Sequence, residues 1–319
     1  MKKAKEKKIK EKKVRKIVYV LQNGKQLDRK AFLRYFEKKV LYTIRKFKLL
    51  EKSDVIAVAC SGGKDSNVLL YCLAQFCKQR KQKLFALAID EGISGYRDKL
   101  LSKLRKFCKK LGVTLKVYSF KKEFGFTLQQ ITRKIAAAGL TNCYVCSILK
   151  RWLLNKKARE LKCTKIVTGH SLDDEAETII ENMFKGNAEM LARLGPVTGV
   201  ASQKGFVQRV KPLYLCSGEE IVLYARLKNI PASAVICPLR GSTIRVEIRN
   251  FLNKMQCKHH EIKNAIVKCY LELAPILKKA YAAKGAGICR ICKEPAAEKV
   301  CKRCQILELL KKQKTKRAS

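Results

Sequence analysis

The sequence predicts an α/β protein with a parallel central sheet and a small cysteine-rich module at its C-terminal end. Three observations predict this fold. Short apolar runs alternate with longer helical stretches between about residues 54 and 172. A glycine-containing loop at 60–66 joins the first apolar run to a helical stretch. Two Cys-x-x-Cys pairs lie between residues 289 and 304. Alternating strands and helices form right-handed βαβ units, which build parallel sheets.

Composition sets the size and charge of the protein. The chain has 319 residues, enough for one large domain with appendages. Lys and Arg total 71 against 26 Asp and Glu, a formal net charge of +45. This excess predicts salt-sensitive binding to a polyanion, with nucleic acid the first candidate and an acidic membrane surface the alternative. No apolar run is long enough to span a membrane and no signal-peptide pattern is visible, so we expect a cytoplasmic protein with no membrane association.

The N-terminal part predicts an arm, a hairpin and a helix. Residues 1–16 form a basic arm, rich in lysine, that would not fold by itself. A short apolar run precedes the Asn-Gly dipeptide at 23–24, which suits a hairpin turn. Residues 31–50 fit a helix entering the core. We therefore expect 17–50 to form an N-terminal unit that leads into the main domain at 51–284.

The main domain contains most of the predicted strands and helices. The strands are expected at 55–60, 84–90, 114–119 and 165–169, and the helices near 66–80, 96–111, 127–138 and 147–161. After Gly195 the pattern is more irregular, with a strand at 206–210 and helices near 217–228 and 242–255. A ligand belongs at the carboxyl ends of parallel strands. The loop at 60–66, Asp90-Glu91-Gly92 and Gly169-His170 all follow such ends.

The loop Cys60-Ser61-Gly62-Gly63-Lys64-Asp65-Ser66 has the composition of an anion-binding turn. Because a strand precedes it and a helix follows it, backbone N–H groups and a helix N-terminus would face the ligand. Gly62 and Gly63 allow a tight turn and close approach of a phosphate. Lys64 adds a charge, and Ser61 and Ser66 add hydroxyl donors. The Walker spacing is absent, since no glycine lies five residues before the Gly-Lys pair.

The final cysteines predict a structural zinc site. Cys289 and Cys292 form one pair, Cys301 and Cys304 the other, with eight residues between the pairs. Four thiolates at this spacing can close a tetrahedral site, and a module this short has too little core to fold without a metal. Four protein ligands leave no open position for catalysis. The module is expected at 285–310, with a hinge at 285–287 before it and a basic tail at 311–319 after it.

Fifteen cysteines without an export signal favour metal or redox chemistry over a disulfide framework. Cys143 and Cys146 form an isolated pair just before the helix that carries Lys150. Such a pair can be a redox dithiol, half a zinc site or part of an iron–sulfur cluster. A cluster needs a further cysteine, for which Cys237 is our choice and Cys216 the competitor. The remaining cysteines are expected to be structural, namely Cys60, Cys72, Cys77, Cys108, Cys163, Cys257 and Cys269.

Together these motifs resemble those of the tRNA 2-thiouridine synthetase family. This family comprises PP-loop ATPases that thiolate 5-methyluridine 54 in thermophile and archaeal tRNA, or the wobble uridine in the cytoplasm. The resemblance covers about residues 17 to 310 and rests on segments 61–66, 89–93 and 169–178, Cys143-x-x-Cys146 with Lys150, Cys237-Pro238, and the final cysteine pairs. It implies a PP-loop ATP pyrophosphatase fold, adenine nucleotide alpha-hydrolase-like, followed by a zinc ribbon.

The resemblance implies an ATP-dependent tRNA sulfurtransferase that forms 2-thiouridine. In such enzymes the uracil C2 oxygen attacks the α-phosphate of ATP, pyrophosphate leaves, and sulfide then displaces AMP. The loop at 61–66 would hold ATP with Mg²⁺, and Ala59, Ile89 and Gly169 would give backbone contacts to adenine and ribose. A [4Fe-4S] cluster on Cys143, Cys146 and Cys237 would carry the sulfur on its open iron.

The resemblance also implies roles for four polar residues. Lys150 lies one helical turn past Cys146 and would contact the α-phosphate. Asp174 is a candidate ligand of Mg²⁺ or a group that positions the base, with Asp65 as the second carboxylate. Asp173 and Asp174 can equally be an acidic pair at a helix N-terminus. His170 is either an adenine contact or a packed histidine.

The expected partners are tRNA, a sulfur donor and a second copy of the chain. The donor would be a ubiquitin-like protein with a C-terminal thiocarboxylate, or free sulfide. One departure from the family concerns its N-terminal zinc module, which usually has two Cys-x-x-Cys pairs, whereas residues 1–30 contain no cysteine. Segment 17–50 would keep the shape of this knuckle without the metal, and the lysine arm would supply electrostatic attraction to tRNA.

Three other functions remain open on the sequence. The first is a PP-loop ligase that forms lysidine or an amide, which leaves the cysteines without a role. The second is a thiolation enzyme without a cluster, in which Cys143 or Cys237 carries a persulfide. The third is a non-catalytic zinc-ribbon protein that binds RNA. The sequence also leaves open which uridine, 54 or 34, is modified.

Overall fold

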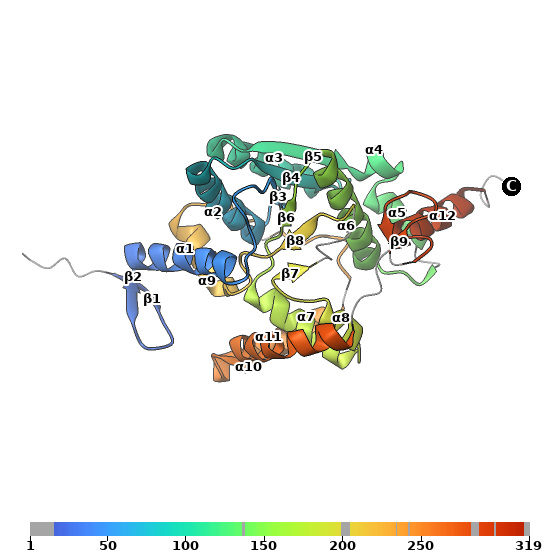
Figure 1. The fold of residues 1–319 in the computed structure, drawn as a ribbon. Coiled ribbons are helices and arrows are strands. Elements are labelled where there is room, and N and C mark those ends of the chain that lie inside the picture. Colours follow the sequence, from blue (N-terminus) through green and yellow to red (C-terminus); the bar gives the residue numbers. More distant parts are fainter. Residues whose placement is uncertain are drawn as a thin grey trace, which may run out of the picture.

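The central element of the fold is a six-stranded sheet with the strand order β5-β4-β3-β6-β8-β7 (Figure 1). The computed structural model describes residues 16–135, 138–198, 205–233, 235–241, 243–281, 287–296 and 298–315. The strands are β3 Ile56–Ala59, β4 Leu84–Asp90, β5 Thr114–Ser119, β6 Lys165–Val167, β7 Val197–Thr198 and β8 Gln208–Val210. Residues 1–15 of the predicted arm, 285 and 286 of the hinge and 316–319 of the tail lie outside the described ranges.

Five neighbouring strands of this sheet are parallel, and β7 pairs antiparallel with β8 at the edge. The chain runs from β3 outward through β4 to β5 and then returns to β6 on the other side of β3. The α/β fold with a parallel sheet is therefore confirmed, and only the short β7 was not predicted. The reversal of strand order beside β3 is a topological switch point, where the loops that follow the strands separate and leave room for a ligand.

Helices connect the strands and cover the sheet. They are α2 Lys64–Arg80, α3 Arg97–Leu111, α4 Phe120–Phe124, α5 Leu128–Ile135, α6 Asn142–Glu160, α7 Leu172–Phe184 and α8 Ala188–Ala192. Burial explains the sequence pattern. Ile56, Ala57 and Val58 of β3 are all fully buried, as expected for a strand covered on both faces. In α3 the apolar residues recur every three or four positions, and the helix ends where Gly112 adopts a left-handed conformation.

The N-terminal hairpin forms as the Asn-Gly dipeptide predicted. Strand β1 Ile17–Val20 pairs antiparallel with β2 Gln26–Asp28, and Gly24 in the connection has φ 77°. Asp28 then caps helix α1 Arg29–Lys46 by accepting a hydrogen bond from the Ala31 N–H, at 2.8 Å. Aromatic contacts anchor the hairpin, since the ring centroids of Tyr19 and Phe32 lie 5.1 Å apart. This segment is held by apolar packing and contains no cysteine.

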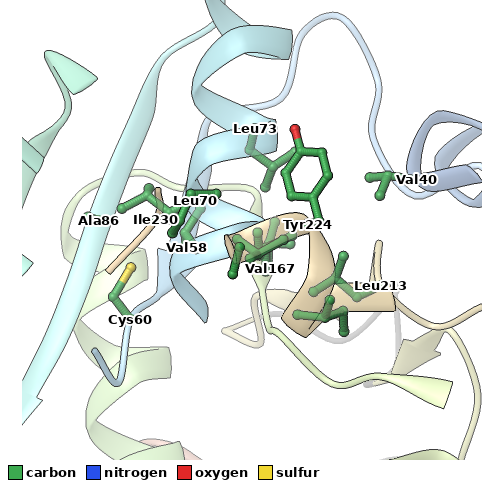
Figure 2. Close-up of a cluster of buried hydrophobic side chains, with 14 of the residues drawn as sticks. Val40, Val58, Cys60, Leu70, Leu73, Ala86, Val167, Leu213, Tyr224 and Ile230 are labelled. Atoms are coloured by element: carbon green, nitrogen blue, oxygen red, sulfur yellow. The ribbon is translucent and has the colours of Figure 1, made fainter. Parts of the chain in front are cut away.

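The main core lies between the sheet, α1, α2 and helix α9 Gly218–Leu227 (Figure 2). Val58 and Val167 come from adjacent strands and Leu70 from α2, while Tyr224 comes from α9. Phe36 of α1 stacks on Tyr224 with a centroid distance of 4.3 Å. This core holds β3 and α2 in place, so the loop between them has a rigid support on both sides.

The region after Gly195 is more regular than the sequence pattern indicates. Helices α10 Ile244–Lys258 and α11 Ile262–Ala280 pack on α7 (Figure 1). The 19-residue α11 was not predicted, and Pro275 lies inside it. Its buried residues, among them Val267, Tyr270 and Ala274, join the core formed with α7. Tertiary burial therefore outweighs the low helix propensity of proline. In the described part of the chain no helix is long and apolar enough to cross a membrane.

The C-terminal module consists of β9 Gly287–Ile288, β10 Pro295–Ala296 and helix α12 Lys302–Thr315. The two strands pair antiparallel. Helix α12 packs against α5 and α6, where Ile306 and Leu310 join a core with Leu149 and Leu153. An ion pair adds to this docking, because the Arg159 Nη1 of α6 lies 2.8 Å from Glu294 Oε2. The module is therefore fixed to α6 by both apolar and charged contacts.

The Phe36 side chain offers a test of this core. We expect Phe36→Ala to lower the free energy of unfolding by about 3–5 kcal/mol, because it removes the stacking on Tyr224 and leaves a cavity. Urea unfolding followed by tryptophan fluorescence measures the change. The control is Phe184→Ala, since Phe184 is 65% exposed, and its effect should stay within ~0.5 kcal/mol. Equal losses in the two variants would contradict the assignment of this core.

Candidate active site at the switch point of the sheet

Three loops meet where β3, β4 and β6 end. The parallel register places these strands side by side, so their carboxyl ends share one edge of the sheet. Strand β3 leads into the loop at 60–66, β4 into residues 91–96 and β6 into residues 168–171. Ala59, Ile89 and Gly169 therefore lie at or just beyond three neighbouring strand ends, as the sequence predicted. This edge includes the switch point beside β3.

The loop at 60–66 is held by its own hydroxyl groups. Gly62 adopts φ 85°, a left-handed conformation that favours glycine. The Gly63 N–H donates to Ser61 Oγ at 3.2 Å, and Ser66 Oγ donates to the Gly63 carbonyl at 3.0 Å. Helix α2 begins at Lys64 without a side-chain cap in the described structure, so its first N–H groups can bind an anion.

A neighbouring segment and a glycine contact position this loop. Gly63 forms a parallel bridge with Ser233, and Asn67 Nδ2 donates to the Pro231 carbonyl at 2.7 Å. On the other side, a Cβ on Gly169 would lie 3.0 Å from backbone atoms of Asp65 and Ser66. Only a glycine allows so close an approach, which explains the residue type at 169.

A cavity of about 110 Å³ borders the loop and brings together residues from distant parts of the chain. Ser61 and Gly63 line it from the loop, and Lys150 and Cys146 from α6. Cys237 lines it from the segment that follows Ser233. The structure thus brings the phosphate loop, the predicted catalytic lysine and two of the three predicted cluster cysteines to one cavity.

A buried carboxylate, Glu91, links Lys150 to the phosphate loop. Glu91 is 3% exposed and forms ion pairs with Lys150 Nζ and with Arg97 Nε, the latter at 3.0 Å. Arg97 in turn donates through Nη1 to the Ser61 carbonyl at 2.5 Å. Burial by itself would lower the pKa of Lys150, but Glu91 outweighs it and raises this pKa, so the ammonium stays charged. The sequence around Glu91 indicates a ligand site, but no local pattern indicates the two partners Arg97 and Lys150.

The isolated cysteine pair lies inside helix α6, which corrects the prediction that it precedes a helix starting near 147. Thr141 caps α6 by accepting from the Tyr144 N–H at 3.3 Å, and the helix begins at Asn142. Three residues apart in a helix, Cys143 and Cys146 lie on the same face. Cys143 is exposed and Cys146 half-buried. Thr141, two residues before Cys143, was the available signal for this start.

Cys237 lies with this pair, whereas Cys216 does not. The Asn142 amide of α6 donates to the Leu239 carbonyl at 3.3 Å, which ties the Cys237 segment to the start of α6. Burial raises the pKa of the Cys146 thiol to about 11, with smaller increases from Glu91, Cys237 and Cys143. Cys216 is fully buried in the main core. Of the cysteines expected to be structural, Cys257 and Cys269 are instead exposed.

The donor chemistry of these three thiols suits an iron–sulfur cluster. Cys146 and Cys237 line one cavity, and the charges of Cys237 and Cys143 both act on the Cys146 thiol. Three cysteine thiolates can ligate three irons of a [4Fe-4S] cluster and leave the fourth iron without a protein ligand. The residue types therefore fit the [4Fe-4S] group that the sequence predicts.

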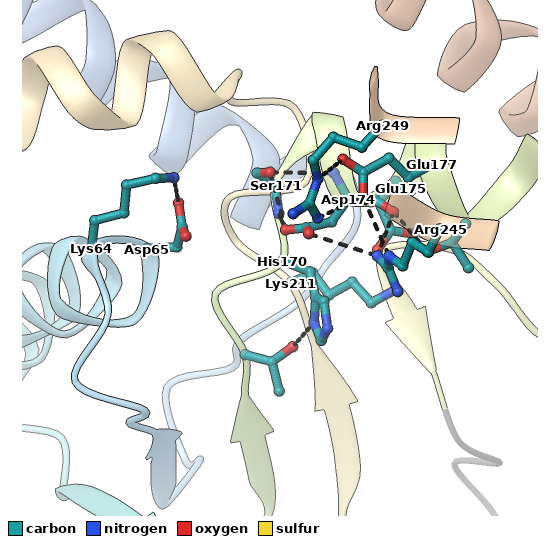
Figure 3. A network of polar contacts seen from close by, with 12 residues as sticks. Lys64, Asp65, His170, Ser171, Asp174, Glu175, Glu177, Lys211, Arg245 and Arg249 are labelled. Carbon is teal, nitrogen blue, oxygen red and sulfur yellow. Dashed lines mark hydrogen bonds and ion pairs between the residues drawn. The ribbon is translucent and has the colours of Figure 1, made fainter. Parts of the chain in front are cut away.

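The start of α7 presents an acidic run to basic partners (Figure 3). Asp173 accepts from the Gly218 N–H at 2.6 Å and pairs with Lys263 at 2.5 Å, so it connects α7 to α9 and α11. Glu175 pairs with Lys211 at 2.7 Å in a buried contact, and Glu177 binds Arg249. These partners come from distant segments, and no local sequence pattern indicates them.

Asp174 has a different environment. Its carboxylate accepts from the Ser171 N–H at 3.0 Å, which forms a capping box, and lies 3.7 Å from Arg245 (Figure 3). The acidic pair therefore does support a helix N-terminus. Burial would raise the pKa of Asp174, but His170, the bonds from Ser171 and Arg245 together lower it.

Asp65 is the second carboxylate of this region. It contacts Lys64 at 2.6 Å, and burial raises its pKa, with Asp174 adding to the effect and Lys64 opposing it. The charge of Asp174 thus acts on Asp65, a residue of the phosphate loop.

His170 is exposed, so it is not a packed core histidine. Its Nδ1 lies 2.9 Å from the Thr168 Oγ1. Desolvation by the surrounding protein, followed by the charge of Lys211, lowers the pKa of His170. A lowered pKa favours the neutral ring, which can both donate and accept a hydrogen bond.

The four C-terminal cysteines form a compact group. The sulfur atoms of Cys289 and Cys304 lie 3.8 Å apart, and those of Cys292 and Cys301 3.6 Å apart. Tetrahedral thiolates around zinc, each about 2.3 Å from the metal, lie at about this separation. Although burial opposes it, backbone N–H groups of the module lower the pKa of Cys289 to about 6. The group fits the predicted structural zinc site.

Comparisons with known proteins agree with this site. A family model described as a PP-loop domain matches residues 34–234. The chain is 34% identical over 281 residues to the tRNA-5-methyluridine(54) 2-sulfurtransferase of Pyrococcus horikoshii, covering 88% of this chain and 87% of that protein. It is 32% identical over 291 residues to cytoplasmic tRNA 2-thiolation protein 1 of Bos taurus, covering 90% of this chain and 82% of that protein.

One solved structure is also similar. It is the U34-tRNA thiolase NcsA from Methanococcus maripaludis with its [4Fe-4S] cluster. The TM-score is 0.79 at 29% sequence identity, and the match covers 92% of this chain and 93% of that one. The chain belongs to the tRNA 2-thiolation family of PP-loop proteins. The resemblance inferred from the motifs is thereby confirmed, and the cavity described above is the candidate active site of this family member.

The ion pairs of Glu91 in this 2-thiolation protein can be tested by a conservative change. Glu91→Gln removes the charge between Arg97 and Lys150 and leaves a buried cation unpaired. We therefore expect the free energy of unfolding to fall by about 3 kcal/mol. Urea unfolding measures this free energy. In the control Glu189→Gln, an exposed pair with Arg193 is lost, and the effect should not exceed ~0.5 kcal/mol. A comparably small effect at position 91 would refute the linking role of Glu91.

The group of four C-terminal cysteines predicts one tightly bound zinc per chain. We expect Cys304→Ser to lose this metal, because serine does not replace a thiolate ligand, and to expose the module to protease where α12 leaves α5 and α6. Elemental analysis and limited proteolysis measure the two effects. Cys257→Ser is the control, since Cys257 is exposed and outside the group. Retention of zinc in Cys304→Ser would exclude this site.

Proposed function

We propose that this protein is an ATP-dependent tRNA sulfurtransferase that replaces the C2 oxygen of a uridine by sulfur. The observation that carries the proposal is the cavity shared by the phosphate loop, Lys150 and the thiols of Cys146 and Cys237. A nucleotide-activating loop and a set of thiols serve one reaction only if they meet in one place. Relatives named as tRNA sulfurtransferases and 2-thiolation proteins support the same reaction.

The first step activates the uridine. The uracil C2 oxygen bonds to the α-phosphate of ATP, and the bond to pyrophosphate breaks. The N-terminus of α2 and the loop hydroxyls of Ser61 and Ser66 would hold the phosphates. Lys150 would turn from Glu91 toward the α-phosphate and stabilise the negative charge that develops there. Ala59, Ile89 and Gly169 would contact adenine and ribose through their backbones, and His170 through its neutral ring.

Asp65 and Asp174 would hold Mg²⁺, which when bound neutralises charge on the departing pyrophosphate. The carboxylate of Asp174 is already oriented by Ser171, so its direction does not depend on the ligand. Lys64 contacts Asp65 at 2.6 Å and would exchange this partner for a phosphate oxygen. Lys64 and Lys150 thus each have a carboxylate partner in the protein, and a phosphate of the substrate would replace that partner.

The second step delivers sulfur. Sulfide forms a bond to C2, and the bond from C2 to the activated oxygen breaks as AMP leaves. Cys143, Cys146 and Cys237 would hold the [4Fe-4S] cluster, which when bound supplies an iron without a protein ligand, open to sulfide. Cys146 and Cys237 line the cavity, so a cluster that they hold would border the space in which the activated base would bind. Cys143, which is exposed, would close the set from the solvent side.

The partners follow from the same reaction. The substrate is a tRNA, consistent with the charge of +45. We further propose that sulfur comes from a ubiquitin-like thiocarboxylate protein or from sulfide, that the protein acts in the cytoplasm, and that two copies associate. The basic arm and the hairpin at 17–28 would form an N-terminal unit that contacts tRNA without zinc.

A reaction with purified components tests the function. The protein is reconstituted anaerobically with iron and sulfide, incubated with unmodified tRNA, Mg²⁺-ATP and sulfide, and the tRNA is digested for mass spectrometry. We expect 2-thiouridine, AMP and pyrophosphate, with the modified position read from nuclease fragments. Lys150→Ala should lower the rate about 10²-fold or more, because it removes charge stabilisation from the first step. Cys257→Ser is the control and should retain the wild-type rate.

Other products would identify the competing functions. Consumption of ATP without 2-thiouridine, unaffected by Cys146→Ser, would indicate a PP-loop ligase. Binding of tRNA without any consumption of ATP would indicate a non-catalytic RNA-binding protein. Thiolation by a protein that contains no iron would remove the cluster from the proposal and favour a persulfide on a cysteine.

A further inference from the structure

A second hollow lies on α6 beside the candidate active site. It has a volume of about 190 Å³ and lies between α6, β8 and the C-terminal module. Its wall includes Arg151, Trp152, Phe206, Arg209, Lys302 and Arg303. We call it the Arg151–Arg209 hollow. None of these residues has a role in the activation or sulfur-transfer steps described above.

Arg151 and Arg209 are held near each other without an acidic partner. Arg209 of β8 donates through Nη2 to the main-chain carbonyl of Arg151 at 3.0 Å. Within the described residues, neither guanidinium forms an ion pair with a carboxylate. The internal segments outside the described ranges contain no Asp or Glu either. The two guanidinium groups are therefore held near each other without a carboxylate partner among the described residues.

The other charges of the hollow do not compensate these cations. Glu294 lies on the wall, but Arg159 Nη1 binds it at 2.8 Å. Lys302 pairs with Glu298 at its exposed end. The Arg303 guanidinium lies 4.3 Å from the centre of the Trp152 ring and adds positive charge. The hollow is thus basic, with an aromatic face on one side.

The two arginines carry an electrostatic cost that an anion would relieve. Desolvation by the surrounding protein, together with the charge of Arg151, lowers the pKa of Arg209 to about 10. Arg209 is half-buried and Arg151 exposed, and the pKa of Arg151 is also lowered by desolvation, with a contribution from Arg245. Like charges held near each other without a counter-charge repel, and a bound anion relieves that repulsion. A phosphate matches the planar fork of arginine and accepts two hydrogen bonds from it.

The hollow continues a row of cations that starts at the candidate active site. Arg245 lies 3.7 Å from Asp174, and its charge acts on Arg151. Arg151 also directly follows Lys150 in α6, so one helix carries a residue of the reactive cavity and a residue of the hollow. An extended polyanion whose reactive unit enters the cavity could therefore reach the hollow along α6 with another of its charged groups.

We propose that Arg151 and Arg209 bind a phosphodiester group of the tRNA backbone beside the uridine that is thiolated. This inference rests on the proposed function for the identity of the RNA. The hollow suits RNA better than an acidic protein tail, because the aromatic side chain of Phe206 lies in its wall next to the charges, where a ribose or base can pack. The sulfur-donor protein is the alternative ligand that the experiment has to exclude.

The double variant Arg151→Gln/Arg209→Gln tests the site. Binding of unmodified tRNA is measured by filter binding over a series of salt concentrations, with the full-length, cluster-reconstituted protein. We expect roughly tenfold weaker binding at fixed salt and a slope of log Kd against log salt that is smaller by about 1. Affinity for Mg²⁺-ATP should not change. The matched control Arg45→Gln/Arg105→Gln removes two exposed arginines from α1 and α3 and should have little effect.

A second variant and a melting experiment separate binding from folding. Arg151→Lys/Arg209→Lys keeps both charges but loses the planar guanidinium groups. Its slope of log Kd against log salt should therefore match wild type, and its affinity for tRNA should lie between those of the wild-type protein and the Gln double variant. Without RNA, the Gln double variant should melt at or above the wild-type temperature, because it removes a repulsive pair. Wild-type affinity and slope in the Gln variant would overturn the proposal. Loss of binding to a thiocarboxylate carrier, with tRNA binding intact, would overturn it in favour of a protein ligand.

The binding experiment tests the phosphate site separately from the proposed thiolation reaction. A wild-type protein that binds tRNA but forms no 2-thiouridine would contradict the sulfurtransferase assignment, while the two double variants would still decide by binding alone whether the hollow holds a phosphate. Conversely, normal thiolation of saturating tRNA by the Gln variant, with an increased KM for tRNA, supports both.

Discussion

The buried carboxylate of Glu91 is the contact on which the candidate site depends. It follows strand β4, binds Arg97 at the start of α3 and meets Lys150 in the middle of α6. Arg97 then reaches the main chain of the phosphate loop at Ser61. One carboxylate between two cations therefore joins four parts of the chain. Because it is almost fully buried, its charge is screened little by solvent and holds both cations firmly.

Helix α6 has two functional sides as a consequence of this arrangement. The side with Cys146 and Lys150 closes the reactive cavity, and the residues that follow, Arg151 and Trp152, form the basic hollow. A third side packs into the core with α5 and α12. The C-terminal module is thus fixed relative to the reactive cavity through the same helix, which gives a physical reason for a structural metal site far from the chemistry.

Local sequence patterns determined much of the fold. The apolar runs of β3 and β4 predicted strands because strands covered on both faces need continuous apolar residues, and β5 at the edge alternates polar and apolar residues. The glycine loop and the final cysteine pairs were identified from the sequence because their spacing dictates local backbone geometry. By contrast α11 was missed, and the start of α6 was placed five residues too late. Burial against distant segments stabilises α11, and the Thr141 cap sets the first residue of α6.

The sequence by itself determined which chemistry this protein carries, since a phosphate loop, an isolated cysteine pair and a group of four C-terminal cysteines are each encoded in a short stretch of residues. Only the tertiary structure decided which distant residues complete them. It placed Cys237 and not Cys216 beside Cys146, and it paired Glu91 with Lys150. Among the residues that the structure describes, it left Arg151 and Arg209 without a carboxylate partner. Such choices depend on contacts between segments more than fifty residues apart, and no local pattern of residue types encodes a contact over that separation.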